Sequence, residues 1–172
     1  VQYTIEIDAA QPSRARVRWQ LTGIDEIERI RFRIDPARFN AFVGSGYFEH
    51  RRNEILWAPN GPYAELSYTA HLNHRRAAGK GYDSYASDDW ILSRTTAFFP
   101  RSAVLFRPDV EPEPEARTRL VLQLPPGWES ATVFPGDGPN RYIVETPSQR
   151  LDHPRGWLIL GRIQRTDTRI VD

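Results

Sequence analysis

The sequence predicts a mainly β protein, folded as an antiparallel β-sandwich with at most one or two short helices. Many short segments alternate apolar and polar residues, which is typical of strands that bury one face. Turn signals containing proline and glycine separate these segments. No long segment has the helical periodicity that the crossover connections of a parallel sheet would need. We expect the chain to form one sandwich domain spanning residues 1–172.

Three strands are predicted in the first third of the chain, over residues 3–8, 14–21 and 29–34. Their apolar faces consist of Tyr3, Ile5 and Ile7, of Ala15, Val17, Trp19 and Leu21, and of Ile30, Phe32 and Ile34. The link between the first two strands contains Pro12 and Ser13, so we expect a hairpin there. In this hairpin Glu6 would face arginines of the second strand, in exposed pairs that contribute about 0 to 1 kcal/mol each.

The remaining predicted strands lie at residues 54–57, 64–72, 119–124, 131–134, 141–146 and 156–163. Between them stand the turn sequences APNGP, LPPGW, PGDGPN and LDHPRG. The sequence GSG at residues 44–46 is predicted to form a flexible turn. Short strands with frequent turns favour a sandwich over other mainly β architectures.

Two stretches depart from the alternating pattern. Residues 107–117 contain three prolines among alternating glutamates, which predicts an extended, polyproline-like connection. In the second stretch, Ser87 precedes Asp88 and Asp89, an arrangement typical of a helix N-cap with negative charge in the first turn. We therefore expect one or two helical turns from about Asp88 to Thr95.

Composition excludes several classes of function. The net charge is only +1, so no long-range field favours nucleic acid. The absence of cysteine excludes disulfides, thiolate zinc sites and cysteine nucleophiles. No apolar run approaches the roughly 20 residues of a membrane span. Because the chain begins with Val1 rather than methionine, we expect a processed or engineered start.

The sequence assigns no catalytic residue and no metal ligand to this chain. Of the four histidines, only His71 and His74 are close in sequence, and on a strand this spacing would point them to opposite faces. The HExxH, GxSxG, P-loop and dinucleotide-binding motifs are absent. A complete small enzyme is therefore not expected.

One segment, GKGYDSYASDDW at residues 79–90, has the composition of a binding site. Its candidate ligand-binding residues are Tyr82, Asp83, Tyr85, Asp88, Asp89 and Trp90. The rings could stack on a sugar, and the carboxylates could contribute to a calcium site, although the EF-hand spacing is not met. The alternative is architectural: a capped turn whose aromatic residues pack on a sheet. We favour the architectural interpretation, and the residues alone leave both open.

The second half of the chain resembles a known family. The segments that carry the likeness are LPPGW (124–128), SATVFP (130–135), the run ending in RLDHPRGWLILG (142–161), and the block from DDW to FFP (88–100). Together they resemble the N-terminal β-domain of the glycyl aminopeptidase family of gluzincin zinc metallopeptidases. IDPARFNAFVGSG stands where that family commonly has a tryptophan-proline-glycine turn.

The resemblance implies that the chain is the N-terminal fragment of a longer polypeptide. In that family the zinc ligands and catalytic glutamate lie in a following helical domain, so no cofactor is expected here and zinc is expected in that catalytic domain. The implied role is a non-catalytic β-domain that packs on the catalytic domain and helps shape the cleft for a peptide substrate. A periplasmic or exported location is expected, with a cytoplasmic one as the alternative.

The rival hypothesis is an autonomous envelope module that binds carbohydrate or calcium through residues 82–90. Surface character separates the two hypotheses. A domain that normally packs on a neighbour should expose an apolar patch, whereas a free-standing module should have a polar surface with one aromatic groove.

Overall fold

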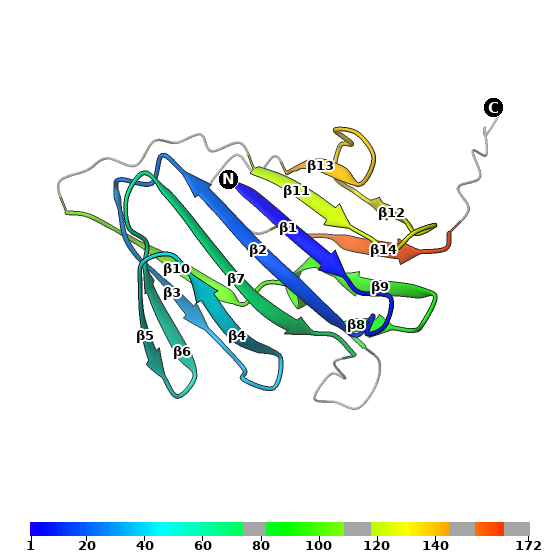
Figure 1. The fold of residues 1–172 in the computed structure, drawn as a ribbon, viewed down its shortest axis with the longest axis horizontal. Helices are drawn as coiled ribbons and strands as arrows, with labels where there is room; N and C mark the ends of the chain where they lie inside the picture. Colours follow the sequence, from blue (N-terminus) through cyan, green and yellow to red (C-terminus); the bar gives the residue numbers. More distant parts are fainter. Residues whose placement is uncertain (74–81, 109–117, 145–153, 164–172) are drawn as a thin grey trace.

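The alternating segments form strands, and strands make up most of the molecule (Figure 1). The computed structural model describes residues 1–73, 82–108, 118–144 and 154–163. Its elements are β1 (Gln2–Ile7), β2 (Arg14–Thr22), β3 (Ile27–Arg33), β4 (Phe39–Gly44), β5 (Tyr47–Arg51), β6 (Glu54–Ala58), β7 (Tyr63–His71), β8 (Ser84–Ala86), β9 (Trp90–Arg94), the 3-10 helix η1 (Thr95–Ala97), β10 (Arg101–Phe106), β11 (Thr118–Gln123), β12 (Glu129–Thr132), β13 (Arg141–Val144) and β14 (Trp157–Gly161).

Six strands form the large sheet, in the order β13-β11-β1-β2-β7-β4. The predicted hairpin of β1 and β2 is present, with Glu6 opposite Arg16. One pairing departs from the antiparallel pattern, because β1 runs parallel to β11 with Tyr3 opposite Leu120. The first strand of the chain therefore lies inside the sheet, with a partner on each side.

Two four-stranded sheets lie behind the large sheet in Figure 1. One, called here the β3 sheet, has the order β10-β3-β6-β5, and the other, called the β9 sheet, has the order β12-β14-β9-β8. Side chains join the layers: the rings of Trp19 on β2 and Phe32 on β3 meet edge to face at 5.2 Å. This layered arrangement confirms the predicted mainly β sandwich.

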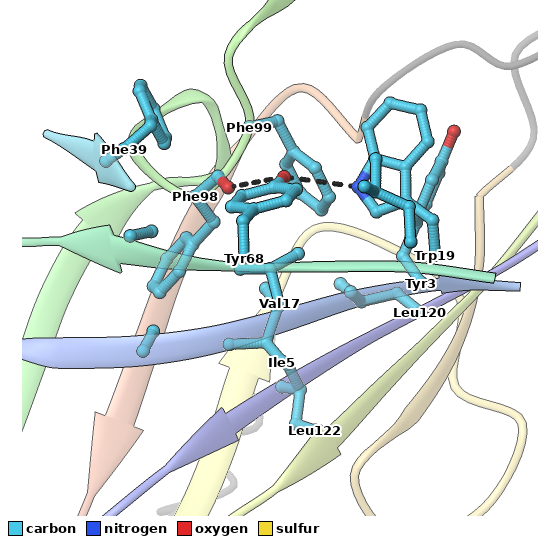
Figure 2. Close-up of a cluster of buried hydrophobic side chains, with 14 of the residues drawn as sticks. Tyr3, Ile5, Val17, Trp19, Phe39, Tyr68, Phe98, Phe99, Leu120 and Leu122 are labelled. Carbon is cyan, nitrogen blue, oxygen red and sulfur yellow. Dashed lines mark hydrogen bonds between the residues drawn. The ribbon is translucent and has the colours of Figure 1, made fainter. Parts of the chain in front are cut away.

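The centre of the core is an aromatic cluster held by two hydrogen bonds (Figure 2). The buried hydroxyl of Tyr68 donates to the carbonyl oxygen of Phe98 at 3.0 Å and accepts from Nε1 of Trp19 at 3.1 Å. Tyr3 packs edge to face on Trp19 and on Phe99, at 4.9 and 5.1 Å. These contacts fasten the large sheet to the segment that links β9 with β10, since Phe98 and Phe99 follow η1.

Strand β4 is not among the predicted strands, and a bulge explains why. Its register against β7 shifts between Asn40 and Val43, and Ala41 has a left-handed φ of 55°. The bulge turns Phe39 and Phe42, three residues apart, toward Tyr68, where Phe42 stacks at 4.8 Å. This spacing breaks the period of two, so β4 has no alternating signature. Strands β5, β8 and β10 were also not predicted.

The predicted helix from Asp88 to Thr95 is wrong. Residues 90–94 form β9, and only the three residues of η1 that follow are helical. Ser87 does hold a turn: its backbone N–H donates to the carbonyl of Trp90 at 2.9 Å, and its Oγ accepts from the backbone N–H of Trp90 at 3.2 Å. Serine and aspartate favour tight turns as much as helix caps, and pairing of β9 with β8 and β14 selects the strand.

Parts of several predictions lie outside the described residues. They include residues 109–117 of the polyproline-like connection, the position of His74, residues 79–81 of the segment GKGYDSYASDDW, the end of the strand predicted at 141–146, and the start of the turn LDHPRG. Within the described part of the chain, no helix is long and apolar enough to cross a membrane.

Candidate functional site

The outer face of the β9 sheet is apolar and exposed. Tyr85, Leu92 and Ile159 lie side by side across β8, β9 and β14, because the register places Tyr85 opposite Leu92 and Leu92 opposite Ile159. Their exposed fractions are 39%, 39% and 40%, whereas the residues that alternate with them are buried in the core. We call this surface the apolar face; it consists of Tyr82, Tyr85, Trp90, Leu92, Trp157 and Ile159.

The aromatic residues of the apolar face touch one another. Tyr85 lies between Tyr82 and Trp90, with ring centroids 5.3 Å away in each case. Gly161 stands opposite Trp90 in the neighbouring strand, and a Cβ at Gly161 would lie 2.7 Å from Cβ of Trp90. The absence of a side chain at Gly161 therefore leaves room for the backbone and Cβ of Trp90. At the other end of the face, the guanidinium of Arg94 lies 5.2 Å from the ring of Trp157.

The outer face of the large sheet has the opposite character. Most of its cross-strand neighbours on β1, β2 and β7 are polar or charged, among them Gln2 with Gln20, Glu6 with Arg16, Arg16 with Thr69, and Gln20 with Glu65. Arg18 also lies 3.4 Å from Glu65, measured from Nε to Oε1. One outer surface is thus suited to water, as antiparallel sheets usually are, while the apolar face is not.

A cleft of about 750 Å³ lies between the β3 sheet and the segments that flank β9 and β14. We call it the arginine cleft, because four arginines line it: Arg33, Arg38, Arg101 and Arg155. Two carboxylates, of Asp35 and Asp83, line it as well. Burial lowers the pKa of Arg38, and the nearby charges of Asp35 and then Asp83 oppose that effect.

The structure separates the candidate residues predicted from the sequence. The three rings of Tyr82, Tyr85 and Trp90 gather on the apolar face, whereas Asp83 lines the arginine cleft. Asp88 and Asp89 occupy the tight turn before β9, where Oδ1 of Asp89 lies 3.9 Å from Nε of Arg162. Among the described residues, no group of three or more histidine, cysteine or acidic side chains is placed to hold a metal ion.

Sequence reasoning missed Leu92, Trp157 and Ile159 as surface residues. The sequence WLILG does carry a signal, since Trp157 and Ile159 are as apolar as Leu158 and Leu160 that alternate with them. A strand that is apolar on both faces is expected to be covered on both faces. The arginine cleft has no such local signature, because its residues are scattered from position 33 to position 155.

Comparisons with known proteins identify a likeness of fold. No protein-family model and no curated protein sequence matches the chain. Among solved structures, the chain is similar to an aminopeptidase N family protein from Idiomarina loihiensis, with a TM-score of 0.64 and 14% sequence identity. The match covers 92% of this chain and 28% of that one. The chain thus spans less than a third of the protein it resembles, and this fold occurs there as one part of a larger chain.

Proposed function

We propose that this chain is an accessory, non-catalytic β-domain of an aminopeptidase-like protein and that it packs through its apolar face on another domain of the same polypeptide. The apolar face is the observation that carries the proposal. Six large side chains with exposed fractions of 37% to 41% stand together on one sheet, on a molecule whose large sheet presents a polar surface. Contiguous apolar surface of this kind marks interaction sites.

The partner is a neighbouring domain rather than an unrelated protein for two reasons. The similar solved structure is that of a longer chain, and the matched region makes up 28% of it. In addition, β14 is the last described strand of the chain, and it carries two residues of the apolar face, Trp157 and Ile159. Contacts between domains of one chain commonly use surfaces of this mixed aromatic and aliphatic kind.

The family resemblance extends the proposal to the parent protein. The parent is a zinc metallopeptidase of the glycyl aminopeptidase family, located in the periplasm or exported, with its zinc and its catalytic glutamate in the domain on which this chain packs. In that setting the β-domain helps shape the cleft that holds the N-terminus of a peptide substrate. The motifs at residues 88–100 and 124–161, together with the likeness of fold, support this extension.

A carbohydrate-binding module is the second candidate, and the contacts among Tyr82, Tyr85 and Trp90 favour it. Exposed aromatic rings offer apolar platforms on which sugar rings can stack. Leu92 and Ile159 complete the same surface, and aliphatic residues of this kind suit a protein partner better than a sugar. Packing on a domain therefore remains the first candidate.

Two experiments test the docking proposal. The coding sequence beyond Asp172 should contain an HExxH motif followed by a distal glutamate. The downstream polypeptide, produced separately, should bind the 172-residue chain in a calorimetric titration, and the double variant Leu92→Glu with Ile159→Glu should weaken binding about 100-fold or more. Leu105→Glu is the matched control, because Leu105 is an equally exposed leucine on the β3 sheet and should not affect binding.

A stop codon directly after Asp172, with no further domain upstream, would refute the proposal. So would unchanged binding by the double variant. Binding of soluble oligosaccharides that is lost in Tyr85→Ala and Trp90→Ala would establish the second candidate instead.

A further inference from the structure

The arginine cleft is a separate feature from the apolar face, and it concentrates positive charge. Arg33 comes from β3, Arg101 from β10, and Arg38 from the turn that precedes β4. Arg155 reaches the cleft from the segment before β14. The whole chain has a net charge of only +1, yet four cationic and two anionic side chains line this one cavity.

The guanidinium groups that line the cleft outnumber its carboxylates, four to two. Oδ1 of Asp35 already accepts a hydrogen bond from the backbone N–H of Ala37 at 3.0 Å. Outside the cleft lining, Arg33 has Glu54 as a neighbour, but at 3.8 Å from Nε to Oε1 this contact is long. Like charges gathered at a cavity repel one another, and an anion bound between them would relieve that repulsion.

Arg38 is the most buried of the four arginines that line the cleft. Its Nε is buried and has no hydrogen-bond partner among the described residues. The guanidinium carbon lies 5.4 Å from the ring centre of Phe39, so the ring occupies one side of the group. Nε itself is shielded from solvent, so an oxyanion in the cleft would meet the remaining part of this guanidinium group, which lines the cavity.

The volume and remaining lining suit a small ligand. About 750 Å³ lies within the usual range of small-molecule sites. Thr96 and Ser102 add hydroxyl groups beside the arginines, and Phe99 and Pro100 add apolar surface. Guanidinium groups bind carboxylate and phosphate oxygens through paired, charge-assisted hydrogen bonds.

We propose that the arginine cleft is a binding site for a compact multivalent oxyanion, carrying phosphoryl or several carboxylate groups, with Arg38 and Arg101 among its donors. This site is independent of the proposed docking function, because it uses none of the residues of the apolar face. A negative result for anion binding would therefore not contradict the docking proposal, and a negative result for docking would not contradict this site.

Calorimetric titration of the 172-residue chain, at constant ionic strength, tests the proposal with two probes. Pyrophosphate represents a phosphoryl ligand and citrate represents a polycarboxylate. At least one should bind saturably with one-to-one stoichiometry. Arg101→Gln and Arg38→Gln should each weaken that binding about tenfold or more. Arg29→Gln is the control: it removes a charge from the same strand as Arg33 but lies outside the cleft lining.

Preference for pyrophosphate would identify the ligand class as phosphorylated, and preference for citrate would identify it as polycarboxylate; both results support the site. Absence of saturable binding by either probe would overturn the proposal. Equal weakening by Arg29→Gln and Arg101→Gln would overturn it too, because it would show a diffuse ionic effect. Arg101 is exposed, so its variant remains informative if Arg38→Gln fails to fold.

Discussion

Tyr68 is the residue on which the core depends most directly. It is 1% exposed, and its hydroxyl joins Trp19 of the large sheet to the carbonyl of Phe98 beyond η1. Burial raises the pKa of Tyr68 well above its ordinary value, because the phenolate would lose its hydration; the hydrogen bond from Trp19 opposes this effect. The hydroxyl is therefore a neutral structural link.

Replacement of Tyr68 by phenylalanine should lower the free energy of unfolding by about 1 to 3 kcal/mol at pH 7, because it removes the shared partner of two buried polar groups. In the wild type, the unfolded state ionises above a pH of about 10 while the folded state stays protonated. The stabilising contribution of Tyr68 is thus complete below that pH and declines as the pH rises toward the raised pKa.

Urea unfolding followed from pH 7 to 11 checks both parts of this prediction. The difference between the wild type and Tyr68→Phe should narrow above pH 10. Tyr47→Phe is the control, since Tyr47 is 70% exposed and should change neither the stability nor its pH dependence. A difference that stayed constant across this range would show that Tyr68 ionises equally in both states.

Ser87→Ala tests the turn that replaces the predicted helix. The substitution removes the acceptor for the backbone N–H of Trp90 and should cost about 1 kcal/mol in the free energy of unfolding. Equilibrium urea unfolding measures it. Loss of a helix cap would lower the stability by a similar amount. The far-UV circular dichroism spectrum distinguishes the two cases, because Ser87→Ala should show no loss of helical signal. Such a loss would contradict the strand assignment of residues 90–94.

Among the strands, the pairing of β9 with β14 depends on Gly161. Its φ is +146°, and an added Cβ would lie 2.4 Å from the carbonyl oxygen of Asp89. Gly161→Ala should therefore lower the free energy of unfolding by about 3 kcal/mol, because the backbone at Asp89 and Trp90 must shift to admit the new methyl group. Thermal unfolding should show the loss. Gly136→Ala is the control, since no atom lies within 4 Å of a Cβ there, and it should shift the melting temperature little.

Strands were predictable where alternation is regular. Strand β2 illustrates this, with Ala15, Val17, Trp19 and Leu21 all fully buried as the pattern indicates. Strand β4 was missed because its bulge at Ala41 breaks the period, and β9 was mistaken for a helix because Ser87 and the acids after it suit either structure. Local chemistry leaves such cases open, and only the neighbouring strands resolve them.

At the scale of the whole molecule, β1 is central to the large sheet, although it is the first strand of the chain. It pairs with both β11 and β2, and Tyr3 and Ile5 are fully buried. Deletion of residues 1–7 should therefore abolish cooperative unfolding, because it removes the strand that joins β11 to β2 and so splits the large sheet. Near-ultraviolet circular dichroism and urea unfolding measure this.

A milder substitution supports the same test if the deleted chain is insoluble. Ile5→Ala should lower the free energy of unfolding by about 2 to 5 kcal/mol, as expected for a buried isoleucine. Ile159→Ala on the apolar face should cost less than about 1 kcal/mol, because Ile159 is 40% exposed. Similar costs for the two variants would show that β1 is peripheral to stability.

The candidate site could be predicted only in part. The rings of Tyr82, Tyr85 and Trp90 stand within nine residues of one another, so the sequence indicated them. Their continuation into Leu92 and Ile159 follows from strand register, and the arginine cleft joins residues that lie more than one hundred positions apart in the chain. Composition and spacing do not show which distant side chains share a cavity.

The sequence by itself determined the mainly β character of this protein and which side chains of its regular strands enter the core, because alternation is a local property of an extended backbone. The tertiary structure alone decided that β1 runs parallel to β11 between two partners, that residues 90–94 form a strand, and that four arginines meet at one cleft. Each of these depends on contacts between segments far apart in the chain, whose free energies are not encoded in any short stretch of residues.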